Sequence, residues 1–109
     1  MSTTFTKKLI VPDRNFIHFL DQFDILFFQS DSCYVTVSLT DGSQFVLIKS
    51  LTKLENEVSS DIFIRVSQSF LINKNKIKNI DRKKKKIMLN EAISVPFTIK
   101  LNKLLELIL

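Results

Sequence analysis

The residues that most often carry enzyme chemistry are scarce in this sequence. Its 109 residues include one histidine, His18, one cysteine, Cys33, and one glycine, Gly42. A zinc site made of His and Cys ligands needs more of these residues than the chain has, and a phosphate-binding loop needs more glycine. A Ser/His/Asp arrangement would depend on His18, and no serine sits in the glycine-flanked turn that exposes a catalytic serine. We therefore expect no enzyme activity, no cofactor and no metal site.

The charge distribution favours a polyanionic partner. Residues 1–48 contain three basic and five acidic side chains, a net charge of −2, whereas residues 49–109 contain thirteen basic and six acidic side chains, a net charge of +7. One strongly basic half is typical of a nucleic-acid binder. The alternative is a solvated, lysine-rich surface without a binding role. Charge alone leaves both interpretations open.

Length and composition indicate one soluble domain in a reducing compartment. The chain is 45% hydrophobic and 25% charged, the balance of a globular protein. No apolar run approaches the ~18 residues of a membrane span, and the N-terminus lacks the apolar stretch of a secretory signal. A single cysteine fits a cytoplasmic protein. We expect residues 1–6 to be a short lead, residues 7–109 to form the domain, and no contact with a membrane.

Alternation of apolar and polar residues predicts that strands position most of the chain. We expect strands at residues 8–11, 16–20, 34–39 and 44–48. Hairpin turns are expected at residues 12–15 and at Asp41-Gly42, where glycine supplies the positive φ. Residues 24–29 are almost continuously apolar, which predicts a strand buried on both faces. Residues 62–66 and 69–72 look extended or irregular, and shorter strands are expected at residues 77–81, 86–90 and 92–95.

Two short helices are expected. Ser50 is a plausible N-cap for a helix of about two turns, in which Leu51, Leu54 and Val58 have helical spacing. Thr98 is expected to open a closing helix whose buried face contains Leu101, Leu104, Leu105 and Ile108. Leu107 and Leu109 fall off this face. They indicate either contact with a second subunit or partner domain, or a frayed helix end.

Several motifs, in the same order, resemble LytTR domains. Residues 25–37 read ILFFQSDSCYVTV and resemble the family's opening strands, which continue into LTDG at 39–42. Residues 49–55, KSLTKLE, resemble the passage into the family's helix. Residues 63–73, FIRVSQSFLIN, resemble its most diagnostic segment, and KIKNI follows at 76–80. The resemblance covers about residues 7–109.

The resemblance implies a mostly β fold: an elongated arrangement of short antiparallel strands in small crossed sheets, with two short helices. It also implies a bacterial transcriptional regulator of the two-component, phosphorelay type that reads double-stranded DNA through loops and anchors on phosphates. Family members usually follow a receiver domain and bind paired direct repeats in promoters. An upstream receiver domain and a homodimer on DNA are therefore expected partners.

Candidate DNA contacts are carried over from the family's motifs, with departures. Where members commonly have His-Arg, this chain has Ser67-Gln68, and the Gln68 amide suits adenine N6 and N7. Where members have Ser-Arg-Arg before the last helix, this chain has Pro96-Phe97-Thr98. The loop at residues 31–33 is short and slightly acidic. The predicted DNA-binding residues are Gln68, Ser67, Lys49, Arg65, Ser32, Cys33, Phe97, Lys100 and Lys103.

Structural alternatives stand beside these roles. Arg65 could instead tie its fork to neighbouring backbone or to a carboxylate, and Gln68 could be an ordinary turn residue. Ser69 and Asn73 are expected to hydrogen-bond within their own turns. The lysines at 83–86 could contact phosphate or form a solvated hairpin tip. For the whole chain, the rival function is a protein–protein interaction module with a decayed DNA-binding surface.

Overall fold

The computed structural model of the protein describes residues 8–109, so the whole predicted lead, residues 1–6, and the first residue of the predicted domain lie outside the described residues. A five-stranded antiparallel sheet forms the centre, with strand order β5-β4-β3-β7-β6. Its strands are β3 (Ile25–Asp31), β4 (Tyr34–Leu39), β5 (Gln44–Leu47), β6 (Phe63–Arg65) and β7 (Phe70–Asn73). The segments at 62–66 and 69–72 are thus paired strands, which the sequence pattern left undecided.

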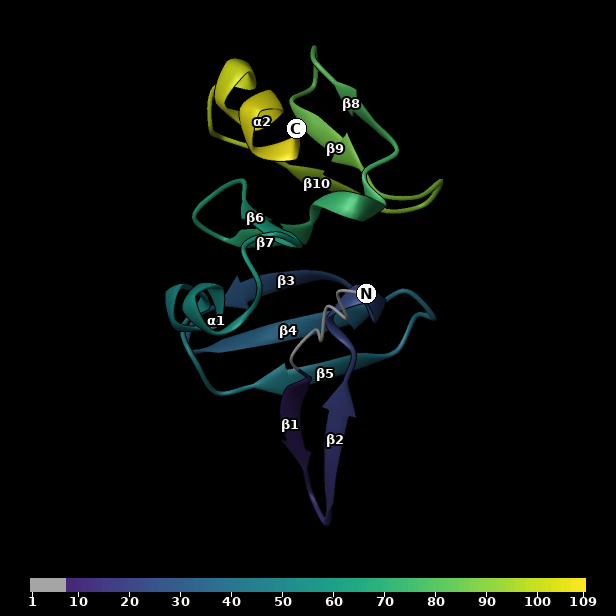
Figure 1. Cartoon of the computed structure of the whole chain (residues 1–109), viewed down its shortest axis with the longest axis vertical. Coiled ribbons are helices and arrows are strands. Elements are labelled where there is room, and N and C mark those ends of the chain that lie inside the picture. The colour runs from purple at the N-terminus through teal and green to yellow at the C-terminus, as the bar shows by residue number, and fades with distance from the viewer. Residues whose placement is uncertain (1–7) are drawn as a thin grey trace, which may run out of the picture.

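Two smaller sheets extend this centre (Figure 1). The predicted first hairpin is confirmed as β1 (Leu9–Asp13) and β2 (Phe16–Leu20), which project from the body. The second sheet has strand order β10-β9-β8, with β8 (Asn79–Asp81), β9 (Lys86–Met88) and β10 (Ser94–Pro96). The three small antiparallel sheets and two helices confirm the predicted fold class.

The five-stranded sheet separates two hydrophobic cores. On one face lie α1 (Leu51–Glu57) and β1, which pack against Phe28, Val37 and Leu71. On the other face lie the three-stranded sheet and α2 (Leu101–Ile108), which pack against Phe27 and Ile72. Because strands alternate their side chains between the two faces, β3, β6 and β7 contribute to both cores, whereas β4 and β5 contribute only to the core under α1. This explains the nearly continuous apolar run that predicted a doubly buried β3.

A β-bulge in β3 places two consecutive side chains in the same core. Ile25 pairs with Leu39 and Phe27 pairs with Ser38, so Leu26 is the extra residue on its strand. A bulge of this kind places neighbouring side chains on one face. Accordingly Leu26 and Phe27 both belong to the core beneath the three-stranded sheet, whereas Ile25 and Phe28 belong to the other core. Strict alternation does not predict this pair.

Local side-chain bonds define the turns and the first helix. The Ser50 hydroxyl accepts a hydrogen bond from Lys53 N at 3.1 Å, which confirms the predicted N-cap of α1. Gly42 has φ +93° in the β4–β5 turn, as expected. In that turn the backbone N–H of Ser43 donates to the carboxylate of Asp41 at 2.8 Å, which lowers the pKa of Asp41 below its ordinary value.

The closing helix differs from the prediction in its start and its buried face. The backbone N–H groups of Thr98 and Ile99 donate to Val66 O, so the helix begins only at Leu101, with Lys100 as N-cap. Leu107 packs into the core, whereas Leu105 is 41% exposed. Both residues flank the stripe Leu101-Leu104-Ile108, and helical periodicity alone does not decide which flank faces the core. Leu109 is exposed.

Candidate nucleic-acid interface

The β6–β7 loop, residues 66–69, is held in shape by Ser67. The Ser67 hydroxyl accepts hydrogen bonds from the backbone N–H groups of Ser69 at 3.2 Å and Phe70 at 3.1 Å. The turn-capping role expected of Ser69 therefore belongs to Ser67. With both bonds made, the loop presents the Gln68 side chain to solvent, and Gln68 is exposed. Ser67 is half-buried and serves the loop's geometry.

Arg65 fastens the same loop to helix α1. Its Nε donates to Ser67 O at 2.7 Å, and one terminal nitrogen donates to Gln68 O at 2.6 Å. The other terminal nitrogen lies 2.9 Å from Glu55 Oε1 and 3.5 Å from Thr52 Oγ1. The guanidinium group of Arg65 therefore donates its hydrogen bonds to the loop backbone and to the side chains of α1. This confirms the structural alternative given for Arg65.

Two neighbouring segments flank this loop. On one side, Ser30 N donates to Ser69 O at 2.9 Å, which joins the loop to the end of β3 and so to the β3–β4 tip. On the other side, Thr98 N donates to Val66 O at 2.9 Å, which joins it to the chain leading into α2. Figure 1 shows the loop, the end of β3 and α1 on one side of the molecule. Three separate stretches of sequence therefore meet at one edge.

The β3–β4 tip carries two of the predicted contacts. Asp31 and Tyr34 pair, which leaves Ser32 and Cys33 as a two-residue turn, and both are exposed. Ser32 has φ +56°, a conformation that costs a serine more than a glycine. The tip is accessible, and its polar groups are the Ser32 hydroxyl, the Cys33 thiol and the Asp31 carboxylate.

Three of the predicted DNA contacts lie near the start of α2, and one of them is buried while two are exposed. Phe97 is only 4% exposed and packs among the residues of the second core. A side chain buried to that extent cannot contact DNA without leaving the core, so Phe97 is not carried into the interface. Lys100 and Lys103 are exposed on the first turn of α2, so their ammonium groups are accessible to phosphate.

Lys49 lies elsewhere. Its ammonium forms a 2.8 Å ion pair with Glu57 and lines a hollow with Lys8, Ile10 and Gln22. The structure therefore brings Gln68, Ser67, Arg65, Ser32 and Cys33 to neighbouring loops, adds Lys100 and Lys103 nearby, and leaves Lys49 with a different set of neighbours.

The sequence interpretation missed Glu55 and Thr52 as supports of the loop. Their signal was present but weak: Glu55 follows Leu51 by four residues, beside the buried stripe of α1, where a side chain can reach the sheet. Asn73 met its expectation, because its side-chain oxygen accepts from Asn75 N at 2.9 Å. Its amide nitrogen also donates to Ile25 O at 2.9 Å inside the protein.

A basic ridge, defined as the eight cations from Lys74 to Lys86, runs from the turn before β8 through the β8–β9 hairpin. At its tip, Asp81 Oδ1 accepts from Lys83 N and Lys84 N, and Lys85 has φ +55°. The side chains of residues 82–86 at the tip are exposed. The ridge therefore concentrates positive charge on the exposed tip of the β8–β9 hairpin.

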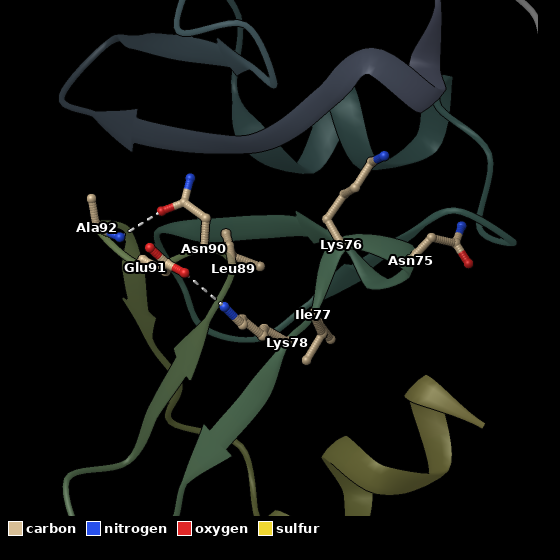
Figure 2. Close-up of a pocket in the computed structure, with 8 residues that line it drawn as sticks. All are labelled: Asn75, Lys76, Ile77, Lys78, Leu89, Asn90, Glu91 and Ala92. Atoms are coloured by element: carbon tan, nitrogen blue, oxygen red, sulfur yellow. Dashed lines mark hydrogen bonds and ion pairs between the residues drawn. The ribbon is translucent and has the colours of Figure 1, made fainter.

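A hollow of about 680 Å³ adjoins the base of this ridge (Figure 2). Lys78 Nζ lies 3.5 Å from Glu91 Oε1 across it, and the Asn90 side chain accepts from Ala92 N at 2.8 Å. These polar groups are engaged with the walls of the hollow itself. Within residues 8–109, no three His, Cys, Asp or Glu side chains gather where they could hold a metal ion. Neither described helix is long or apolar enough to cross a membrane.

Comparison with known proteins gives a family and a fold. The family model described as the LytTr DNA-binding domain matches residues 15–109. Among solved structures, the chain is similar to the LytTr DNA-binding domain of a Bacillus cereus protein described as a methyl-accepting/DNA response regulator. The TM-score is 0.74 at 18% identity, covering 86% of this chain and 88% of that one. A search of curated protein sequences finds no match.

Proposed function

The chain belongs to the LytTR family of DNA-binding domains, and from this premise we propose that it is the output domain of a bacterial transcriptional regulator. It binds double-stranded DNA, with sequence read by loops and register fixed on phosphates. The proposed functional unit is residues 7–109, acting without a cofactor and without catalysis. Because its target is promoter DNA, we place it in the bacterial cytoplasm.

The observation that carries this proposal is the clamped β6–β7 loop. Arg65 and Ser67 hold its backbone through four hydrogen bonds, while Gln68 is exposed. The Gln68 amide can pair with adenine by donating its N–H to N7 and accepting from N6–H with its oxygen. Two such bonds to one base need a loop backbone that holds the amide in place. We assign base reading to Gln68 and loop support to Arg65 and Ser67.

Phosphate contact is assigned to the flanks. Lys100 and Lys103 are exposed beside the loop, and Ser32 and Cys33 form a neighbouring tip that reaches a second contact with the duplex. Lys49 is kept as a weaker, outlying phosphate contact, which would require release from Glu57. The basic ridge raises the rate of encounter with DNA by long-range attraction.

The wider assembly follows the family. We propose that two copies occupy paired direct repeats in a promoter, as a homodimer on DNA, and that an upstream receiver domain controls them in a two-component phosphorelay. A single module of this size makes few base contacts, so two linked sites raise both affinity and specificity.

The test is to select a binding site from random duplex and to titrate the protein against the selected and random duplexes at several salt concentrations. The proposal expects a selectable site with two half-sites and clear preference over random DNA. If no site can be selected and random duplex is bound only weakly at low salt, sequence-specific binding is excluded.

A further inference from the structure

Among the described residues, no strand pairs with the outer edge of β2. Within residues 8–109, β2 has β1 as its partner strand, while the far side of β1 packs against β5. Figure 1 shows the hairpin projecting from the body, and the ring of His18 in β2 lies against that of Phe45 in β5. A strand in this position offers a row of free backbone N–H and C=O groups.

Pro12 identifies which backbone groups are free. The hairpin register pairs Pro12 with Ile17 and Ile10 with Phe19. Antiparallel pairs alternate between hydrogen-bonded and non-hydrogen-bonded, and proline has no N–H to donate. Pro12 and Ile17 therefore form a non-hydrogen-bonded pair, and so do Ile10 and Phe19. The N–H and C=O groups of Ile17 and Phe19 consequently point away from β1, toward the open edge.

This edge lacks the usual protection against pairing. Natural edge strands are blunted by lysine, by inward charges, by proline or by bulges. The sequence of β2, FIHFL, has no lysine, carboxylate or proline, and its pairing with β1 runs without a bulge. By contrast, the edge strands β6 and β8 carry Arg65 and Asp81.

The hairpin also exposes a large apolar surface. Ile10, Pro12, Ile17 and Phe19 share its outer face, and Phe16 stands near its tip. Four large side chains, Ile10, Phe16, Ile17 and Phe19, are each more than half exposed. At about 200 Å² for each fully exposed side chain, they leave on the order of 500 Å² of apolar surface. Patches of this size on monomers are often functional.

We propose that β2 pairs with β2 of a second copy of this chain, antiparallel, about a two-fold axis at His18. Ile17 and Phe19 are the residues with outward backbone groups, so Ile17 of each copy exchanges hydrogen bonds with Phe19 of the other. His18 then faces His18 as a non-hydrogen-bonded pair. The two outer faces join into one apolar surface across a four-stranded sheet.

The free backbone groups and the charge favour a second copy as the occupant. The same edge of a second copy satisfies the outward N–H and C=O groups of Ile17 and Phe19, and it places Ile17 of one copy beside Phe19 of the other as a cross-strand apolar pair. The hairpin contains one aspartate and one arginine, Asp13 and Arg14, so two copies meet there without net repulsion. The cations of residues 49–109 stay outside this contact. The pairing is a property of the free protein and does not depend on the proposed function.

The first experiment measures self-association of the full chain by sedimentation equilibrium, at roughly micromolar to hundred-micromolar concentrations. Phe19→Lys places a charge on the outer face of the edge strand, so the dimer dissociation constant should rise at least tenfold. Phe23→Lys is the matched control: Phe23 is also an exposed phenylalanine, at 46%, but it lies outside β2. It should leave the constant unchanged. A monomeric parent chain, or equal effects of the two variants, would overturn the proposal.

The second experiment tests the register. Across the proposed axis the two His18 Cα atoms lie about 4.5 Å apart, inside the about 4.4–6.8 Å span of a disulfide. In a Cys33→Ser background, His18→Cys should therefore form a covalent dimer on mild oxidation. Phe19→Cys should not, because its Cα atoms would lie about 8 Å or more apart. Cross-linking through Phe19→Cys alone, or through neither variant, would show a different contact.

Discussion

The β6–β7 loop and the β8–β9 hairpin are both exposed, yet they are built in opposite ways. The loop carries the proposed base reader, Gln68, and its backbone is held by hydrogen bonds to Arg65 and Ser67. The hairpin carries five consecutive basic residues, 82–86, and its aspartate fixes only the turn. Base reading needs fixed geometry, whereas attraction to phosphate needs only charge. On the proposed function, specificity therefore belongs to the loop and electrostatic attraction to the hairpin.

Removing the Arg65 side chain, which holds the β6–β7 loop, should have the largest effect on stability and on sequence specificity. Arg65→Ala deletes the bonds to Ser67 O, Gln68 O and Glu55, which leaves a carboxylate and two carbonyls without their donor. We expect a loss of about 2–3 kcal/mol in the free energy of unfolding and a loss of most preference for the selected site over random duplex. Chemical denaturation and duplex titration measure the two quantities.

Arg65→Lys is the control for charge. It keeps the cation but cannot form the fork that bridges two carbonyls and Glu55. If Arg65 acts through geometry, Arg65→Lys should lose specificity nearly as Arg65→Ala does. Retention of specificity in the lysine variant would mean that charge at this position matters more than the fork.

Gln68→Ala should have the next largest effect, and on one duplex only. A good bidentate contact is worth about 1–3 kcal/mol of discrimination, so binding to the selected site should weaken by that amount. Binding to random duplex and the salt dependence should stay unchanged, because no charge is lost. Equal weakening on both duplexes would show that Gln68 supports the loop and does not read a base.

Removing a lysine charge should change the affinity for the selected duplex and for random duplex by the same amount. For about five phosphate contacts, the logarithm of the association constant for random duplex should fall with the logarithm of salt concentration at a slope of about −4 to −5. Lys100→Ala should make this slope shallower by about one unit on both duplexes alike. Replacing Lys83, Lys84 and Lys86 with glutamine should mainly slow association at low salt. A shallower equilibrium slope in that triple variant would place the ridge on the DNA.

The sequence could predict whatever depends on local patterning. The hairpins, the Ser50 cap, the Gly42 turn and the doubly buried β3 follow from alternation, capping and turn chemistry, and the family follows from ordered motifs. The start of α2 did not follow, because Thr98 and Ile99 donate to Val66, more than thirty residues earlier. Long-range partners of this kind leave no periodic signal.

In the candidate site, too, some residues could be predicted from the sequence and their contacts could not. Motif position was enough to select Gln68 and Arg65 for attention. The partners of Arg65 on α1, the burial of Phe97 and the pairing of Lys49 with Glu57 depend on tertiary packing. The choice between Leu105 and Leu107 is similar, since both flank the apolar stripe and only the position of the core decides.

The smallest expected effect on stability and binding concerns the β3–β4 tip. This tip is exposed, but its backbone is not held like that of the β6–β7 loop, and it is not basic like the β8–β9 hairpin. Ser32 has φ +56°, so Ser32→Gly relieves backbone strain of about 1 kcal/mol, while the extra freedom of glycine in the unfolded chain costs a similar amount. The free energy of unfolding should therefore change by less than about 1 kcal/mol.

A larger change in the free energy of DNA binding must then come from the lost Ser32 hydroxyl. If Ser32→Gly weakens binding to the selected site but not to random duplex, the tip reads a base as the β6–β7 loop does. If both duplexes weaken together, the hydroxyl contacts phosphate, and if neither does, base reading belongs to the clamped loop without the tip.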